Sequence, residues 1–246
     1  MSNKHINIFF FAFFNIIVFY SQNIEGVITY KASSKKAIKY VKEEKESDKD
    51  KKIIKREVNN LYKNAKDIKA FLKFNNKISE YTAVDRMVTS SQENFNLTHI
   101  MSGGKNKYYT KKSDTGYKNS TLNCELLGEC FLIESLLPEW ELTQETKFIS
   151  GYLCYKAILR NKRTGKKTVQ AWYAPKIPYG YGIMDYYGLP GMILEISRNT
   201  ILITAIKIQI NPPKKMVIKE PEDVKKVNQE EFKKMQKKAF PGFYKN

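Results

Sequence analysis

Paired runs of alternating apolar and polar residues constrain this chain more than any other feature. Ala70, Leu72 and Phe74 recur at every second position before a turn-forming Asn-Asn pair, and a second β-type run follows at residues 78–84. A two-residue period interrupted by turn residues predicts a β-hairpin. The same pattern predicts two more hairpins, at 152–159 with 167–174 and at 192–197 with 200–210, and single strands at 26–30, 99–101, 107–110 and 129–135.

Two segments have a helical pattern instead. In a Lys-rich stretch at about 35–69, apolar residues at three- and four-residue spacings form one stripe on an otherwise charged helix: Ile54, Val58, Leu61, Tyr62, Ala65 and Ile68. This stripe favours an amphipathic helix packed on a sheet, although a basic helix that lies on a membrane surface or binds nucleic acid has the same pattern. Asn228 and Glu231 resemble a capping box and predict a C-terminal helix at about 229–239.

The order of these elements predicts the fold class. Neither a repeat of fixed period nor a Gly/Ser-rich linker divides residues 23–246, so we expect a single domain. About eight to ten strands with hairpin connections and two helices indicate a mainly β, α+β protein. We therefore predict a single curved antiparallel sheet or half-barrel, with flanking helices against one face.

The first 22 residues have the pattern of a secretory signal peptide. Lys4 supplies a positive charge, an apolar run follows at residues 8–20, and Ser21 is a small residue next to the expected cleavage site. The run is too short to cross a bilayer as a helix, which needs about 20 residues. We therefore expect cleavage near Ser21 or Gln22 and export to the periplasm or the cell surface, with a retained N-terminal anchor as the alternative.

Composition limits the classes of partner. The chain has 43 Lys and Arg against 25 Asp and Glu, a formal net charge of +18, and 28% charged residues. Such a chain cannot be embedded in a membrane, and its charge supports weak attraction to anionic surfaces, so we expect at most peripheral membrane contact. Acidic residues are mixed through the Lys-rich segment and the chain is expected to be exported, which argues against a nucleic-acid partner.

Few residues in the sequence could carry out catalysis. There are two histidines, His5 and His99, and the sequence has none of the motifs typical of phosphate, dinucleotide, zinc-protease or serine-nucleophile sites. Spacings typical of zinc ligands are also missing, so we expect no metal and no cofactor. We therefore favour a protein that is not an enzyme; the alternative is a hydrolase that uses Cys154, or a carboxylate pair, with His99.

The three cysteines leave two arrangements open. In an exported protein, Cys124 and Cys130 could form a small disulfide loop, which leaves Cys154 unpaired. An odd number of cysteines fits a buried thiol equally well.

The segment from 171 to 196 is the most unusual part of the chain, because it combines many aromatic residues, prolines and glycines with almost no charge. Such a segment is costly to leave in water unless it packs or binds something. It is either an aromatic surface for a ligand or partner, or a structural corner that plugs one end of the sheet. Within it, Gly188, Leu189, Pro190 and Gly191 fit a type II turn. The candidate binding residues are Trp172, Tyr173, Ile177, Pro178, Tyr186, Tyr187, Leu189 and Pro190.

Residues 188–196 closely resemble the signature of the GLPGLI family of exported Bacteroidota proteins. Upstream parts of the family pattern follow in the expected order: Trp140, Thr146, Lys147, Ile149, Gly151, Tyr152, Cys154, Ala157, Ala171, Trp172, Tyr173, Ile177 and Pro178. Met192 stands where the family usually has Leu, and Gly182 with Ile183 replaces a usual Gly-Pro pair. The resemblance implies export but no established activity, and the strand arrangement loosely resembles that of periplasmic lipoprotein carriers.

These observations favour an exported, non-catalytic binding or chaperone-like module of the cell envelope. Its curved sheet would hold an apolar small molecule, a lipid or a hydrophobic peptide, or dock an envelope protein, with the aromatic segment 172–191 at the rim. Burial of a few aromatic side chains would contribute several kcal/mol, at roughly 25 cal/mol per Å². Besides the hydrolase, an accessory subunit of an outer-membrane transporter is a further alternative.

Overall fold

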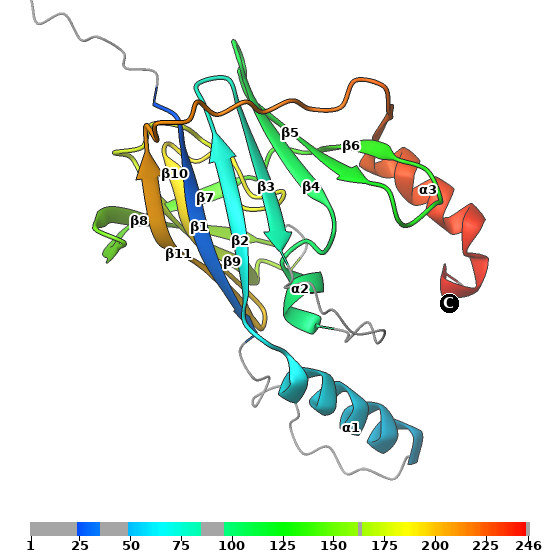
Figure 1. The fold of residues 1–246 in the computed structure, drawn as a ribbon. Coiled ribbons are helices and arrows are strands. Elements are labelled where there is room, and N and C mark those ends of the chain that lie inside the picture. The colour runs from blue at the N-terminus through cyan, green and yellow to red at the C-terminus, as the bar shows by residue number, and fades with distance from the viewer. Residues whose placement is uncertain (1–23, 35–48, 85–95, 162–163, 245–246) are drawn as a thin grey trace, which may run out of the picture.

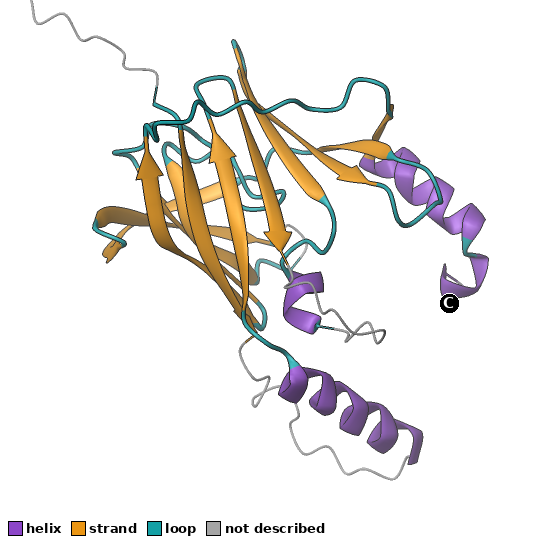
Figure 2. Cartoon of the chain, viewed as in Figure 1, coloured by secondary structure: helices purple, strands orange, loops and turns teal. Residues whose placement is uncertain are grey.

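A computed structural model describes residues 24–34, 49–84, 96–161 and 164–244, which form one large sheet with helices at its margins (Figures 1 and 2). The expected signal peptide, residues 1–22, and the first part of the Lys-rich segment, residues 35–48, lie outside these ranges. The strands are β1 (Gly26–Ser34), β2 (Ile68–Phe74), β3 (Ile78–Val84), β4 (Lys107–Ser113), β5 (Gly116–Asn123), β6 (Phe131–Ser135), β7 (Trp140–Ile149), β8 (Tyr152–Arg160), β9 (Lys167–Ala174), β10 (Met192–Arg198), β11 (Ile201–Ile210) and β12 (Lys225–Asn228). The helices are α1 (Lys49–Asn64), α2 (Leu97–Met101), α3 (Gln229–Ala239) and a short 3₁₀ helix at Pro241–Tyr244.

The predicted fold class is confirmed: the described chain is mainly β, in one open sheet with the strand order β12-β6-β5-β4-β3-β2-β1-β11-β10-β9-β8-β7. The three hairpins expected from the sequence are β2–β3, β8–β9 and β10–β11. One detail differs from a purely antiparallel sheet, because β12 pairs with β6 in parallel.

The connection between β6 and β7 shows why the sheet must curl. These strands lie ten positions apart in the strand order, which would separate them by about 48 Å in a flat sheet. Only four residues, 136–139, connect them, and such a segment reaches at most about 18 Å. The sheet therefore bends until its two ends approach each other, as the ribbon shows (Figure 1).

The loop between β9 and β10, residues 175–191, occupies the inside of this bend (Figure 1, yellow). Tyr181 and Ile183 of the loop are fully buried. The ring of Tyr181 contacts Phe74 of β2 and Tyr117 of β5, with centroid distances of 6.5 and 5.5 Å. The Tyr30 hydroxyl of β1 donates a hydrogen bond to the Ile193 carbonyl of β10, the strand that follows the loop, at 2.7 Å. The loop thus fills the concave face and forms one hydrophobic core with the central strands.

The helices correct two expectations. The strand predicted at 99–101 is wrong, because Leu97–Met101 forms the single-turn helix α2, in which the Asn96 side chain caps the backbone N–H of Thr98. The stripe of α1 does not pack on a sheet face: Val58 and Leu61 are 43% and 39% exposed, and the helix projects from one end of the sheet (Figure 1). By contrast, α3 has the predicted capping box, and its Phe232 packs on Phe131 of β6.

Candidate functional site

The structure does not bring the eight candidate binding residues together on one surface. Five of them are at most 7% exposed and belong to the core or contact it: Tyr173, Ile177, Tyr186, Tyr187 and Leu189. Pro178 and Pro190 are exposed. Trp172, on the other face of β9, is half-buried beneath Lys147, whose Nζ lies 4.4 Å from the centre of the indole ring. Most of the aromatic side chains of the segment therefore pack into a structural corner and do not form an exposed rim.

The predicted type II turn at Gly188–Gly191 is also wrong. In such a turn the N–H of Met192 would bond to the carbonyl of Leu189. Instead the N–H of Gly191 donates to Leu189 at 2.8 Å, which makes a tighter turn around Pro190, and the N–H of Met192 donates to Ile177 at 3.0 Å. The bond to Ile177 ties the end of the loop to its beginning, which explains why the tighter turn forms.

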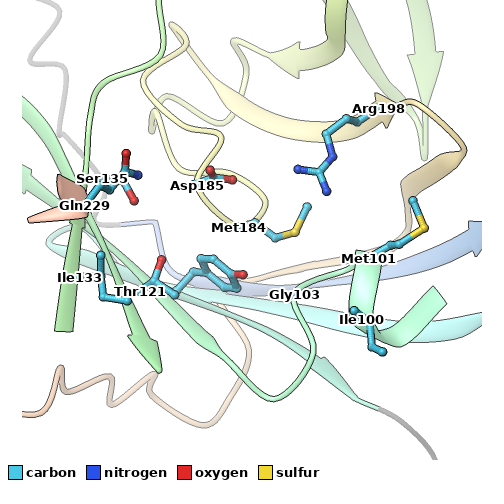
Figure 3. Close-up of a pocket in the computed structure, with 11 residues that line it drawn as sticks. Ile100, Met101, Gly103, Thr121, Ile133, Ser135, Met184, Asp185, Arg198 and Gln229 are labelled. Carbon is cyan, nitrogen blue, oxygen red and sulfur yellow. The ribbon is translucent and has the colours of Figure 1, made fainter. Parts of the chain in front are cut away.

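One corner of this loop, residues 184–185, lines a pocket of about 240 Å³ that we call the inner pocket (Figure 3). The side chains of Asp185 and Arg198 lie on its wall, and the Arg198 guanidinium points into it (Figure 3). The pocket is lined by Ile100, Met101, Gly103, Tyr108, Thr121, Ile133, Ser135, Met184, Asp185, Arg198 and Gln229. It is thus built from α2, β4, β5, β6, the loop, β10 and the start of α3.

The polar groups of the inner pocket are incompletely paired. Arg198 Nη1 donates to the Tyr186 hydroxyl at 3.1 Å, while the Nε atom of Arg198 is buried without a hydrogen-bond partner. Within the described part of the chain, Arg198 forms no ion pair with Asp185. Burial raises the pKa of the Asp185 carboxyl above its usual value, and the nearby Arg198 offsets only part of this rise. Burial also raises the pKa of the Tyr108 phenol to about 12, so that phenol is protonated at neutral pH.

A larger cavity of about 800 Å³, which we call the outer groove, adjoins the inner pocket. The two share the lining residues Ser135, Asp185 and Gln229. The outer groove runs between the β6–β7 connection, the start of β7, the end of β8 and the turn that follows β8. Its lining residues are Ser135, Leu136, Leu137, Pro138, Glu139, Trp140, Glu141, Ile158, Leu159, Arg160, Asn161, Gly165, Asp185, Tyr186 and Gln229.

Two leucines dominate the wall of the outer groove. Leu136 and Leu137 are 81% and 58% exposed, although Leu is among the residue types most often buried. They cannot withdraw into the core, because the loop already fills it and the short connection is held on both sides. The indole Nε1 of Trp140 donates to the Tyr187 carbonyl at 2.8 Å, and the Tyr187 hydroxyl donates to the Ser135 carbonyl at 3.1 Å.

Gly188 allows the connection to lie this close to the loop. Its φ of +84° is one that side chains rarely adopt, and a Cβ there would be 2.6 Å from Leu137 Cδ1. The two leucines also border a further cavity of about 380 Å³ on the side of β5 and β6. The sequence analysis missed four residues of these cavities: Leu136, Leu137, Asp185 and Arg198. Two adjacent leucines, and a single acidic residue in an apolar loop, are the sequence signals that could have indicated the first three.

Two of the residues proposed for a hydrolase, Cys154 and His99, line neither cavity. Cys154 of β8 is fully buried, its Sγ donates to the Tyr152 carbonyl at 3.4 Å, and burial raises the pKa of the thiol to about 11. A thiol in this state is a poor nucleophile at neutral pH. His99 lies on α2 and lines neither the inner pocket nor the outer groove. Of the carboxylates, Glu141 pairs with Arg160 at 2.6 Å on the rim of the groove.

Other sequence expectations concern cysteine pairing and metal ligands. Cys124 and Cys130 form a disulfide, and Cys154 is free. In the part of the chain that the structure describes, no cluster of three His, Cys, Asp or Glu side chains could hold a metal ion. Within the same residues, no helix has the length and apolarity needed to span a membrane.

The described chain is therefore a curled, open β-sheet protein with a plugging loop, an outer groove and a polar inner pocket. A family described as a protein of unknown function (Porph_ging) matches residues 160–195, from the end of β8 through the loop into β10. That match includes Asp185 and the turn at Gly188–Gly191 but covers a minority of the chain. A search of curated proteins gave no match.

Among solved structures, the chain is similar to the "Structure of PNGF-II in C2 space group" (15% identity, TM-score 0.49) and the "Structure of PNGF-II in P21 space group" (14% identity, TM-score 0.48). The similarities cover 88% and 87% of this chain. The chain spans 33% of the length of each of those structures. Sequence identities this low concern the fold alone.

Proposed function

We propose that this protein is an exported, non-catalytic binding module of the cell envelope, a member of the GLPGLI family, and that it holds an apolar chain in the outer groove. The observation that carries the proposal is the exposure of Leu136 and Leu137, at 81% and 58%, along a cavity of about 800 Å³. Contiguous exposed apolar surface of this kind marks binding sites in soluble proteins.

The size and lining of the groove support an alkyl chain as its occupant. Ligand pockets typically measure about 300–1,000 Å³ and combine an apolar wall with a few polar groups. Here Leu137, Trp140 and Leu159 provide apolar contacts, whereas Glu141 and Arg160 pair with each other on the rim. Covering two exposed leucines contributes about 1.5–3 kcal/mol each before the cost of association. A lipid-type chain therefore fits the groove better than a wholly polar ligand.

The hydrolase alternative has less support, because the pKa of the Cys154 thiol is raised by burial and His99 lines neither cavity. A binding module keeps its ligand affinity when His99 is replaced by Ala. A purified protein that turned over a substrate, with a rate abolished by His99→Ala or Cys154→Ala, would contradict the non-catalytic proposal.

Binding is tested with N-phenyl-1-naphthylamine, a neutral apolar probe that fluoresces when it leaves water, and with dodecanol as a competitor. We expect Leu137→Ser to weaken binding of the probe about tenfold, because one buried leucine contributes about 1.5–3 kcal/mol. The matched control is Leu142→Ser: Leu142 is similarly exposed, at 54%, but lies on β7 outside the groove. Equal effects of the two substitutions, or no binding by the wild type, would overturn the proposal.

Export is tested separately by expressing the full chain and separating the cell fractions. We expect the mature protein outside the cytoplasm, with an N-terminus that begins after Ser21 or Gln22. Recovery of the uncleaved chain in the cytoplasm would contradict export.

A further inference from the structure

We propose that the inner pocket binds the anionic head group of an amphiphile whose alkyl chain lies in the outer groove. The proposal rests on the proposed function for the position of the chain, and it adds the chemical class of the ligand. Its structural basis is a half-buried cation, Arg198, whose buried Nε atom lacks a hydrogen-bond partner at the inner end of a groove lined by leucines.

The Arg198 guanidinium is the cation that would bind the head group. A guanidinium has five N–H donors, and a buried donor without an acceptor is costly. Arg198 Nη1 is bonded to the Tyr186 hydroxyl, whereas Nε is buried and unpartnered. In the described residues, no carboxylate forms an ion pair with this side chain. A carboxylate or phosphate oxygen from a ligand would supply the missing acceptor and neutralise the charge.

The polar groups of the inner pocket indicate the sign of the ligand's charge. The buried atom of the pocket that lacks a hydrogen-bond partner is a donor, the Nε of Arg198. The Tyr108 phenol is protonated at neutral pH and can also donate. The chain as a whole carries a net charge of +18, which attracts anions toward the site. These three observations favour an anion over a cation.

The inner pocket and the outer groove adjoin each other. Because Asp185, Ser135 and Gln229 line both, a ligand in the groove can place its end in the inner pocket. The volume of about 240 Å³ exceeds what a carboxylate or phosphate group needs, since one water occupies about 30 Å³. Met101 and Met184 supply adaptable apolar contacts beside the guanidinium (Figure 3).

The role of Asp185 follows from its position on the same wall. Its carboxylate, when ionised, repels an anionic head group bound beside Arg198. Replacing Asp185 by Asn removes the repulsion while leaving Arg198 and the groove in place. Affinity for an anionic amphiphile should therefore rise in this variant, a gain that a folding defect would not produce.

The test is calorimetric titration of the full chain with laurate and with dodecanol, which have the same chain length but differ in charge, at a mildly alkaline pH where laurate is ionised. We expect laurate to bind about tenfold more tightly than dodecanol, because a hydrogen bond to a charged group has an effect of this order. Arg198→Gln should abolish this preference. Asp185→Asn should strengthen laurate binding several-fold without changing dodecanol binding.

Arg56→Gln is the matched control, because it makes the same substitution at an exposed arginine of α1 that lines neither cavity. It should leave the preference for laurate unchanged. Leu137→Ser should weaken laurate and dodecanol binding equally. Dodecyl phosphate in a parallel titration distinguishes the head groups: tighter binding than laurate assigns a phosphate, and weaker binding assigns a carboxylate.

The outcomes separate the two proposals. If neither laurate nor dodecanol binds, the proposed function fails and the head-group site fails with it. If both bind equally and Arg198→Gln changes neither, the groove stands and the head-group site is refuted. If Arg56→Gln reduces the preference as much as Arg198→Gln does, the preference reflects the overall charge of the protein and the assignment to the inner pocket is refuted.

Discussion

Two fully buried tyrosines differ in a way that allows a sharp test of how the loop is held. The Tyr30 hydroxyl of β1 donates to the Ile193 carbonyl of β10 at 2.7 Å, beside the β-bulge of that strand. The Tyr181 hydroxyl, in the loop between β9 and β10, is buried without a hydrogen-bond partner. Both side chains are 0% exposed, so replacing either Tyr by Phe removes one hydroxyl from the same core.

The two substitutions should have different effects on the free energy of unfolding. Tyr30→Phe should lower it by about 1–3 kcal/mol, because it removes a buried hydrogen bond and leaves the acceptor short of a partner. Tyr181→Phe should leave it unchanged or raise it by about 1 kcal/mol, because the hydroxyl that it removes pays a desolvation cost with no bond in return.

The measurement is urea denaturation followed by circular dichroism, with the free energy extrapolated to water and the slopes compared among the wild type and both variants. Equal slopes are needed for the comparison, because a changed slope means a changed native or unfolded state. A loss for Tyr181→Phe as large as that for Tyr30→Phe would refute the reasoning, since it would show that the Tyr181 hydroxyl has a partner.

Three further outcomes follow from the structure. Gly191→Ala should lower the free energy of unfolding by about 1–3 kcal/mol in the same assay, because the φ of Gly191 is +155° and an added Cβ would lie 2.5 Å from the Ala174 carbonyl oxygen at the end of β9. The control Gly242→Ala should have no effect, because nothing lies within 4 Å of the Cβ that it adds. Burial raises the pKa of the Cys154 thiol to about 11 in the folded protein, above its unfolded value, so the free energy of unfolding should fall as pH rises from about 8.5 to 11. A free energy of unfolding that stayed constant over this pH range would contradict the raised pKa. Replacing Cys124 and Cys130 by Ser should cost about 2 kcal/mol, because the disulfide closes a short loop, and an unchanged urea midpoint would argue against that estimate.

Several of the strands that the sequence predicted have one apolar face. β2 and most of β9 alternate between buried and more exposed positions, so their pattern is visible in the sequence without knowledge of their neighbours. β5 has no such pattern, because the residues that it buries are the polar Asn119 and Ser120. The Asn119 Nδ2 atom donates to Thr110 on β4 at 2.9 Å. A strand that buries polar groups is hidden from a search for apolar periodicity.

The groove and the inner pocket were beyond sequence-based prediction for a different reason. Their residues come from segments around 100, 135, 160, 185, 198 and 229, and nothing local indicates that these meet. The aromatic loop attracted attention because of its composition, yet most of its aromatic side chains are buried, and the exposed apolar surface belongs to Leu136 and Leu137. Composition indicates that a segment needs burial, but the rest of the fold determines whether it receives it.

The sequence alone determined the β class, three hairpins, the C-terminal helix and the presence of an apolar segment before β10, because each depends on residues close together in the chain. The tertiary structure decided the order of the strands, the curl of the sheet and the position of the site. A four-residue connection between β6 and β7 brings the two ends of the sheet together, and the loop fills the space between them. The exposure of the two leucines and the position of Arg198 in the inner pocket both follow from that long-range closure, because burial depends on which distant segment covers a residue.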